Sequence, residues 1–382
     1  MLRLKVIGCG AAGNKAAISL IDDFFDSKDV LLINSTAKDI PQEHKDISLI
    51  FGSAADSLGG CGKEREIAKR LFLKDLKSGT ISLDSIVDPT TNAVVICSST
   101  EGGSGSGITP IVAQYIREVI GVPVIVVLFF GFNSDVRGMQ NSIEICQELA
   151  EDYGVIGIAN SKFMEEANNN KIKAEELANK EFCKIIRILS GVDIIPGSQN
   201  IDDTDLYKLV VTPGYMHVES ASMKNVKNVE MFNKTINAAI DTSRQIDTKK
   251  SVERIGCIFD IPKSIEDFMD YEASVLIQRY GKPYEMYTHV QNTEGTSGTC
   301  TWIASGMDLP IDEVKEIFEN YKKSSASVSK SKDSFFGEIS GLTGNQEDSM
   351  FNMLSSGKRN NMSKSAFFDS YGFKDKDKKD TK

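Results

Sequence analysis

Twice in this sequence an apolar run leads into a cluster of glycines, and the glycines lead into a segment with helical periodicity. The first cluster, residues 8–14, follows the apolar run at 4–7, and the second, residues 102–107, follows the run at 93–97. Glycines between a strand and a helix let the backbone approach a ligand closely, and the free amides at the helix start bind phosphate. The two clusters therefore predict an α/β fold with phosphate-binding loops at one edge of a sheet.

Apolar runs alternate with helical segments through the first half of the chain. The apolar runs lie at residues 4–7, 30–34, 93–97, 124–130 and 155–159, and the helical segments at 14–25, 108–120, 136–151 and 173–190. Strands that are apolar on both faces and separated by helices indicate a parallel sheet with helices on both sides. We therefore predict a Rossmann-like nucleotide-binding domain in residues 1–172, then a long central helix and its following loop in 173–208.

The pattern changes after the central helix. Strand-like runs lie at residues 209–211, 255–259, 285–290 and 299–304, and helical patterns at 226–246, 265–279 and 311–321. This arrangement predicts a second, smaller α/β domain in residues 209–321. The remainder, 322–382, is rich in Ser, Lys, Asn and Gly, and we predict a flexible, disordered C-terminal tail.

The end of this tail is locally basic. Between Lys358 and Lys382 it carries eight Lys or Arg and four Asp. One interpretation is a solvated tail that keeps the protein in solution, and the other is a tether for an acidic or DNA-bearing partner. Four aromatic side chains would give such a tether its apolar anchors: Phe367, Phe368, Tyr371 and Phe373.

Composition excludes several other classes of protein. The net charge of −10 argues against a surface that coats itself in nucleic acid. The longest apolar run, residues 122–130, is far shorter than the about 20 residues of a membrane helix. The N-terminus lacks the pattern of a signal peptide, so we expect a cytoplasmic protein. The seven cysteines form no CxxC pair and are expected to be reduced and buried.

The first glycine cluster on its own also fits a dinucleotide-binding fingerprint. That fold expects an acidic residue at the end of the second strand to hold a ribose, and this chain has Asn34, Ser35 and Thr36 there. A dinucleotide fold also has no use for the second cluster, whose interleaved Gly and Ser expose successive amides to an anion. A nicotinamide-dependent oxidoreductase is therefore a weak alternative. A third glycine stretch, residues 59–62, opens another helical segment and is no Walker loop, because Glu64 follows Lys63.

An acidic loop follows the central helix at residues 200–205. Asp202 and Asp205 could polarise a water for attack on a phosphoryl group, directly or through a metal. The plainer interpretation is that Asp202 caps a helix. The three histidines show no metal-ligand spacing, and no metal site made of protein side chains is expected: His44, His217 and His289.

Together these loops resemble the tubulin/FtsZ superfamily. Its first three phosphate loops match residues 8–14, 34–36 and 59–62, its GGGTGTG signature matches 101–107, and its NxDxxD synergy loop matches 200–205. The order and spacing of all five loops agree. Within the superfamily, residues 33–39, 60–65 and 105–110 look most like the TubZ proteins of plasmids and phages.

The resemblance implies a GTPase that polymerises head to tail, with its active site completed by the next subunit. It would bind GTP or GDP, with Mg²⁺ held through the phosphates, and Asp202 and Asp205 of the next subunit would position the attacking water. The residues expected to contact the nucleotide are Gly10, Ala11, Ala12, Gly13, Asn14, Asn34, Gly62, Gly102, Gly103, Ser104, Gly105, Ser106, Gly107, Arg137 and Asn179.

Three positions depart from the family pattern. Glu101 replaces the first glycine of the signature, Asn133 stands where division proteins have a ribose-contacting Glu, and Glu175 stands where they stack an aromatic on guanine. The chain also lacks the Pro-x-Phe peptide through which division proteins reach membrane adaptors. The resemblance therefore favours filaments that segregate or position DNA, with a tail that binds a DNA-bound adaptor of the TubR kind. A division-type GTPase and a non-hydrolysing filament protein are the alternatives.

Overall fold

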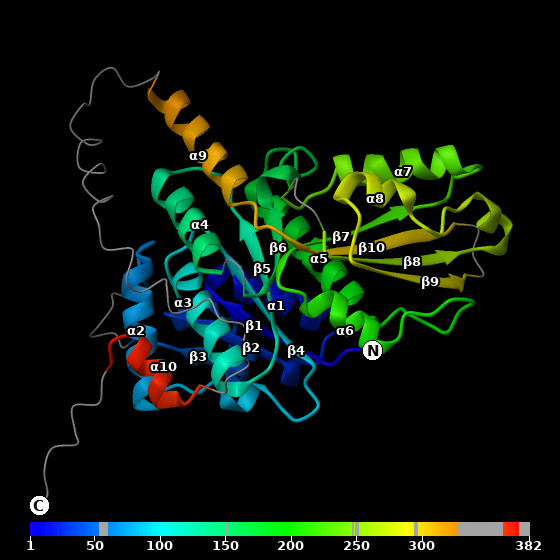
Figure 1. The fold of residues 1–382 in the computed structure, drawn as a ribbon. Coiled ribbons are helices and arrows are strands. Elements are labelled where there is room, and N and C mark those ends of the chain that lie inside the picture. The colour runs from blue at the N-terminus through cyan, green and yellow to red at the C-terminus, as the bar shows by residue number, and fades with distance from the viewer. Residues whose placement is uncertain are drawn as a thin grey trace, which may run out of the picture.

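In the computed structural model the described residues form one mixed sheet covered by helices (Figure 1). The described residues are 1–52, 60–149, 152–246, 248, 252–293, 297–326 and 362–373. Within them the sheet has ten strands in the order β3-β2-β1-β4-β5-β6-β7-β10-β8-β9. This architecture confirms the predicted class, a large parallel-dominated sheet with helices on both sides.

The first seven strands in this order are mutually parallel. They are β3 (Ser48–Ile50), β2 (Val30–Asn34), β1 (Leu4–Cys9), β4 (Ala93–Ser99), β5 (Val124–Phe130), β6 (Gly154–Ala159) and β7 (Gly214–Ser222). Beyond β7 the sheet turns antiparallel, because β10 runs against both β7 and β8, whereas β9 is parallel to β8. These last strands are β10 (Thr299–Met307), β8 (Arg254–Ile261) and β9 (Glu285–Asn292).

Helices bury both faces of the sheet. One face is covered by α1 (Gly10–Asp23), α5 (Lys171–Ser190) and α6 (Asp203–Val211). The other is covered by α2 (Arg65–Ser78), α3 (Ser104–Gln114), α4 (Val136–Leu149), α7 (Val229–Asp241), α8 (Ser274–Tyr280) and α9 (Ile311–Ala326), and α10 (Lys364–Ser370) packs outside this layer. Along β4, Val94 and Ile96 face one layer while Val95 and Cys97 face the other. This two-sided burial is why the strand is apolar throughout.

Short helical turns complete the described chain. They are η1 (Ser27–Asp29), η2 (Ala37–Asp39), η3 (Gln42–Ile47), η4 (Asp84–Ile86), the π-helical η5 (Tyr115–Ile120), η6 (Asn160–Phe163) and η7 (Lys263–Phe268). η5 continues α3 without a break and ends at Gly121, which takes a left-handed conformation with φ 87°. The predicted helix at 108–120 is therefore α3 together with η5.

Two predictions in the second half are wrong. Residues 209–211 are the end of α6 and not a strand, because the acidic loop starts that helix at Asp203. The strand lies further on, in β7, where the buried polar residues His217 and Glu219 obscure the apolar pattern. The predicted helix at 265–279 is interrupted, since it comprises η7 and the separate helix α8.

The prediction of a flexible tail is wrong for the parts of 322–382 that the structure describes. Residues 322–326 continue α9, and residues 362–373 contain α10, which is capped by Ser363 and buries Phe367 and Phe368. The rest of the predicted tail lies outside the described residues. The predicted domain boundary at 208 falls inside α6, and the domain division stays a prediction.

Other expectations concern chemistry rather than shape. All seven cysteines are buried, as expected, and none is paired with another. No helix in the described part of the chain combines the length and hydropathy that a membrane span requires. Across the same residues, no group of three or more His, Cys, Asp or Glu side chains is arranged to hold a metal ion.

Candidate functional site

The N-termini of α1 and α3 meet at the carboxyl ends of the neighbouring strands β1 and β4. Their contact is made by two glycines. A Cβ on Gly10 would lie 2.8 Å from the Cα and N atoms of Gly105, and a Cβ on Gly105 would lie 2.5 Å from the carbonyl oxygen of Cys9. Gly10 also has a positive φ of 74°. Any larger residue would separate the two helix ends.

Neither helix end is capped by a side chain. The residues before α1 and α3, Cys9 and Gly103, make no capping hydrogen bond, and neither first turn contains an acidic residue. By contrast, α5, α6 and α7 are capped by Asn170, Asp202 and Asn228. The first amides of a helix lack partners inside the helix, and the helix dipole is positive there. Two such ends side by side form an anion site.

A groove of ≈ 290 Å³ opens over these helix ends. Its lining comes from four segments: Cys9, Gly10, Ala11 and Ala12; Asn34, Ser35, Thr36 and Asp39; Gly60; and Ser99, Gly102, Gly103, Ser104 and Gly105. The Ser35 and Ser104 hydroxyls lie 2.7 Å apart and join the second loop to α3. The Asn34 amide donates to Asp39 at 3.1 Å. The structure thus brings eight predicted residues into one groove: Gly10, Ala11, Ala12, Asn34, Gly102, Gly103, Ser104 and Gly105.

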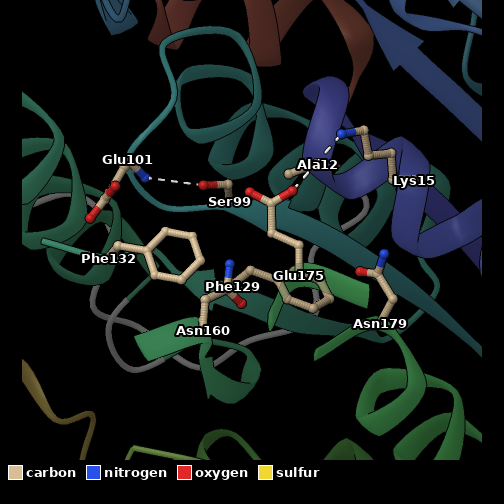
Figure 2. A pocket seen from close by; sticks show the side chains of 10 residues that line it. Ala12, Lys15, Ser99, Glu101, Phe129, Phe132, Asn160, Glu175 and Asn179 are labelled. Atoms are coloured by element: carbon tan, nitrogen blue, oxygen red, sulfur yellow. Dashed lines mark hydrogen bonds and ion pairs between the residues drawn. The ribbon is translucent and has the colours of Figure 1, made fainter. Parts of the chain in front are cut away.

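A second hollow of ≈ 100 Å³ adjoins the groove, since Ala12 and Ser99 line both. Figure 2 shows Asn179 and Glu175 of α5 together with Asn160, Phe129 and Phe132 around it. Glu175 faces Lys15 of α1 at 3.9 Å. Two side-chain amides beside aromatic rings suit a planar heterocycle that presents hydrogen-bonding edges.

Asn160 lines the second hollow and is a candidate site residue that the sequence reasoning missed. Its side chain is 9% exposed, and its Oδ1 atom has no hydrogen-bond partner among the described residues. It lies directly after β6, where the carboxyl end of a parallel strand meets the pocket. Ligands bind at this edge in open α/β sheets. A polar residue immediately after an apolar run was the available signal.

Several predicted contact residues line neither hollow and pack the loops instead. A Cβ on Gly13 would overlap the Cys97 carbonyl, and one on Gly107 would lie 2.8 Å from the Arg65 carbonyl oxygen. Asn14 is buried and donates to the Ile33 carbonyl at 3.4 Å, while the Ser106 hydroxyl donates to the Gly102 carbonyl. Gly62, with φ 56°, has open space beside it. As nucleotide contacts, these five positions stay predictions.

The third loop is tied to the start of α4 by ion pairs. Arg137 binds Glu64 at 2.7 Å, and so it lines neither hollow in this conformation. Lys63 pairs with Asp135 and holds the pKa of that carboxyl below its ordinary value. The contact that the sequence assigns to Arg137 also stays a prediction.

Glu101 supports one wall of the second hollow. Its carboxylate accepts the Asn133 N–H at 2.9 Å and fills the space that the absent side chains of Gly131 and Gly138 leave. Burial raises the pKa of Glu101, against the smaller opposing effects of the Asn133 amide and Lys63. The acid that replaces a signature glycine therefore holds the loop that carries Phe132.

The acidic loop lies apart from both hollows. Asp202 is the N-cap of α6, where it accepts the Asp205 N–H at 2.8 Å, and the Asp205 carboxylate accepts the Asp202 N–H at 3.4 Å. The capping interpretation is therefore confirmed. Asp202 remains exposed to solvent, and neither acid lines the groove of its own chain.

Comparisons with known proteins agree with this geometry. Residues 3–168 match the model of the Tubulin/FtsZ family, GTPase domain. Cell division protein FtsZ 2 of Methanocaldococcus jannaschii is 24% identical over 221 residues, which cover 56% of this chain and 54% of that protein. FtsZ of Mycoplasmopsis pulmonis is 24% identical over 215 residues, covering 55% and 53%. The chain spans about half the length of these curated relatives.

Solved structures extend the likeness across most of the chain. A GTPγS-form protofilament of Bacillus thuringiensis serovar israelensis TubZ superposes with a TM-score of 0.70 at 16% identity, covering 86% of this chain and 92% of that one. CetZ2 from Haloferax volcanii, a GTPγS-bound protofilament, gives 0.69 at 16% identity, covering 84% and 100%. Identities this low establish the fold. Residues 3–168 therefore match the GTPase domain of the Tubulin/FtsZ family, and the fold of the chain is similar to that of the TubZ and CetZ structures.

Proposed function

We propose that this protein binds GTP and hydrolyses it to GDP and phosphate. The observation that carries the proposal is the contact of two uncapped helix N-termini at Gly10 and Gly105. Such a site suits a chain of phosphates, because amides and two helix dipoles face the anion without an acidic side chain in either first turn.

The second hollow supports guanine as the base. Asn179 and Asn160 offer amide donors and acceptors for its edge, and the free Oδ1 atom of Asn160 would gain a partner. Mg²⁺ fits beside the groove, where the Ser35 and Ser104 hydroxyls and the Asp39 carboxylate supply oxygen atoms. Bound through the phosphates, the metal would neutralise their charge during transfer.

We further propose that the active site is completed by a second subunit. Phosphoryl transfer is catalysed by positioning and electrostatics, and it needs a group that orients the attacking water. Asp202 and Asp205 are acids suited to that role, but they stand apart from the groove of their own chain. Head-to-tail stacking would bring them to the groove of the next subunit, and two of the similar solved structures are described as protofilaments.

The biological role that we propose is the segregation or positioning of plasmid or phage DNA by these filaments. The support is the likeness to TubZ structures and the basic composition after Lys358, which suits a DNA-bound adaptor of the TubR kind. A division-type GTPase is the alternative, because the curated relatives are division proteins. No observation favours a nicotinamide-dependent oxidoreductase over these two kinds of GTPase.

Nucleotide preference is the direct test of the binding proposal. Thermal unfolding of the full chain would be followed with GTP, GDP, ATP or NAD added in the presence of Mg²⁺. We expect guanine nucleotides to raise the midpoint and the others to leave it unchanged, because a ligand that binds the folded state stabilises it. Protection by NAD and none by GTP would contradict the proposal. Asn179→Ala should reduce the rise in midpoint that GTP and GDP cause and leave the midpoint without nucleotide unchanged.

A further inference from the structure

The last described segment, residues 362–373, lies against the outer side of α2 and η5 (Figure 1). In the sequence it is far from both of these helices. Its two ends are fixed by backbone groups. The Met362 N–H donates to the Glu118 carbonyl at 2.8 Å, and the Lys77 ammonium donates to the Phe373 carbonyl at 2.8 Å. The segment is therefore docked over its whole length.

Specific side chains hold the segment between these ends. Phe367 is fully buried and meets Tyr115 edge-to-face, with ring centroids 5.2 Å apart. Lys364 pairs with Asp84 at 2.6 Å and lowers the pKa of that carboxyl. The Tyr371 hydroxyl donates to Gln114 at 2.6 Å. An aromatic anchor surrounded by matched polar contacts is the pattern of a specific docking site.

The docked segment contacts α2 and the η5 continuation of α3, and the other end of α3 lines the candidate nucleotide groove. α2 begins beside the third loop, and α3 begins at Ser104 in the phosphate site. Near the groove the two helices are tied by the buried Arg65, which donates to the Ser106 carbonyl at 3.1 Å. At their far ends they are tied by the segment, through Lys77 on one side and Tyr115 on the other.

We propose that residues 362–373 dock on the α2, η4 and η5 face in linkage with the nucleotide, so that a filled groove favours the docked segment. Helices transmit displacement because each is a nearly rigid rod. Nucleotide in the groove would fix the start of α3, to which Arg65 ties the start of α2, and the segment requires a fixed position of the two helices at their other ends. The proposal rests on the nucleotide site proposed above, and linkage makes the effect reciprocal.

The linkage has a consequence for any partner of the tail. Phe367 and Phe368, which the sequence suggests as anchors for a partner, are covered by the chain itself in the docked state. A partner can therefore bind these aromatic side chains only when the segment is undocked. A nucleotide-filled groove would keep the segment docked, so the partner would bind after the nucleotide has dissociated.

Hydrogen exchange on the full chain tests the proposal. Amide exchange in residues 362–373 would be measured with and without GTPγS, and GTPγS affinity would be titrated in parallel. We expect GTPγS to slow exchange of the segment at least about 5-fold, the lower end of typical coupling between sites. Lys364→Glu, which opposes Asp84, should undock the segment and weaken GTPγS binding by the same factor.

Matched variants separate docking from general damage. The double variant Lys364→Glu with Asp84→Lys restores an ion pair and should restore both protection and affinity. Tyr284→Ala removes an aromatic side chain that is 84% exposed, and it should change neither. GTPγS binding at normal affinity with unchanged exchange of the segment would overturn the linkage. A chain that bound no GTPγS would overturn the proposed function and the linkage together, and the titration distinguishes the two results.

Discussion

The helix starts at the phosphate site and the helix start at the acidic loop are built in opposite ways. α1 begins at Gly10 and α3 begins directly after Gly103, and neither helix has a side-chain cap or an acid in its first turn. α6 begins with a reciprocal capping box of two carboxylates and carries Asp203 and Asp205 in its first turn. One kind of end leaves its amides open to an external anion, whereas the other satisfies them internally and displays negative charge. The proposed shared site needs both kinds of end, because the open end of one subunit would hold the anion and the acidic end of the next would orient the water.

The largest effect is expected from a substitution that forces the uncapped ends of α1 and α3 apart. In Gly105→Ala the new Cβ would meet the Cys9 carbonyl, and the helices must separate. We expect an overpacking cost of about 1–3 kcal/mol in the free energy of unfolding. We also expect a loss of nucleotide affinity of at least about 100-fold, or about 2.7 kcal/mol. Titration with a fluorescent GDP analogue would measure it.

Gly102→Ala is the matched control. It lies in the same loop and lines the same groove, but a Cβ there meets nothing within 4 Å. We expect affinity within a few-fold of the wild type. If both variants bound equally well, the glycine contact could not be what forms the site.

The role of Asp202 is tested with a substitution that keeps the helix cap and removes the negative charge. Asn caps a helix as well as Asp, so Asp202→Asn should leave the free energy of unfolding nearly unchanged. We expect nucleotide binding to persist and turnover to fall about 100-fold, as for the loss of a water-orienting acid. GTP hydrolysis at saturating nucleotide and thermal unfolding would be measured on the same samples. Full turnover in this variant would reduce Asp202 to a structural cap.

Asn160 tests whether the hollow is built for a ligand. Its Oδ1 atom is buried and has no partner among the described residues, so Asn160→Ala removes an uncompensated polar group. We expect unchanged or slightly higher stability without nucleotide, together with a loss of affinity of about 10-fold. Chemical unfolding and nucleotide titration report these separately. Lower stability with unchanged affinity would assign Asn160 to the core instead.

The smallest expected effect concerns Glu101. Because burial raises its pKa, its charged form is disfavoured in the folded state. Its contribution to stability therefore falls as pH rises from the ordinary value of 4.5 through the raised pKa. Glu101→Gln keeps an acceptor for the Asn133 amide and should remove this slope. Thermal unfolding of both proteins across that interval would show it, and parallel curves would contradict the assignment.

The first half of the fold could be predicted because its strands are buried on both faces. β2 and β5 begin and end at the predicted residues. β7 was missed because its polar side chains are satisfied by distant partners: His217 meets the Tyr280 hydroxyl at 2.6 Å, and Glu219 meets Lys184 at 3.1 Å. Such pairs form only after folding, so the local sequence does not reveal them.

The glycine loops of the sequence predict the phosphate groove, but they do not show which glycines line it and which pack against other elements. Gly10 and Gly105 line the groove, but Gly13 and Gly107 pack against β4 and α2. All four look alike in the sequence, because their roles depend on which backbone the topology places beside them. The docking of residues 362–373 was missed for the same reason, since its anchors meet Tyr115 only in the folded chain.

The account rests on a site shared between subunits, and hydrolysis as a function of protein concentration tests it most directly. GTP turnover per subunit and the pelleted fraction would be measured on the same samples of the full chain. We predict a threshold concentration above which turnover and polymer rise together, because the acids and the groove meet only in an assembly. Turnover per subunit that is constant at every concentration, with nothing pelleting, would show that one chain holds a complete site and would contradict the account.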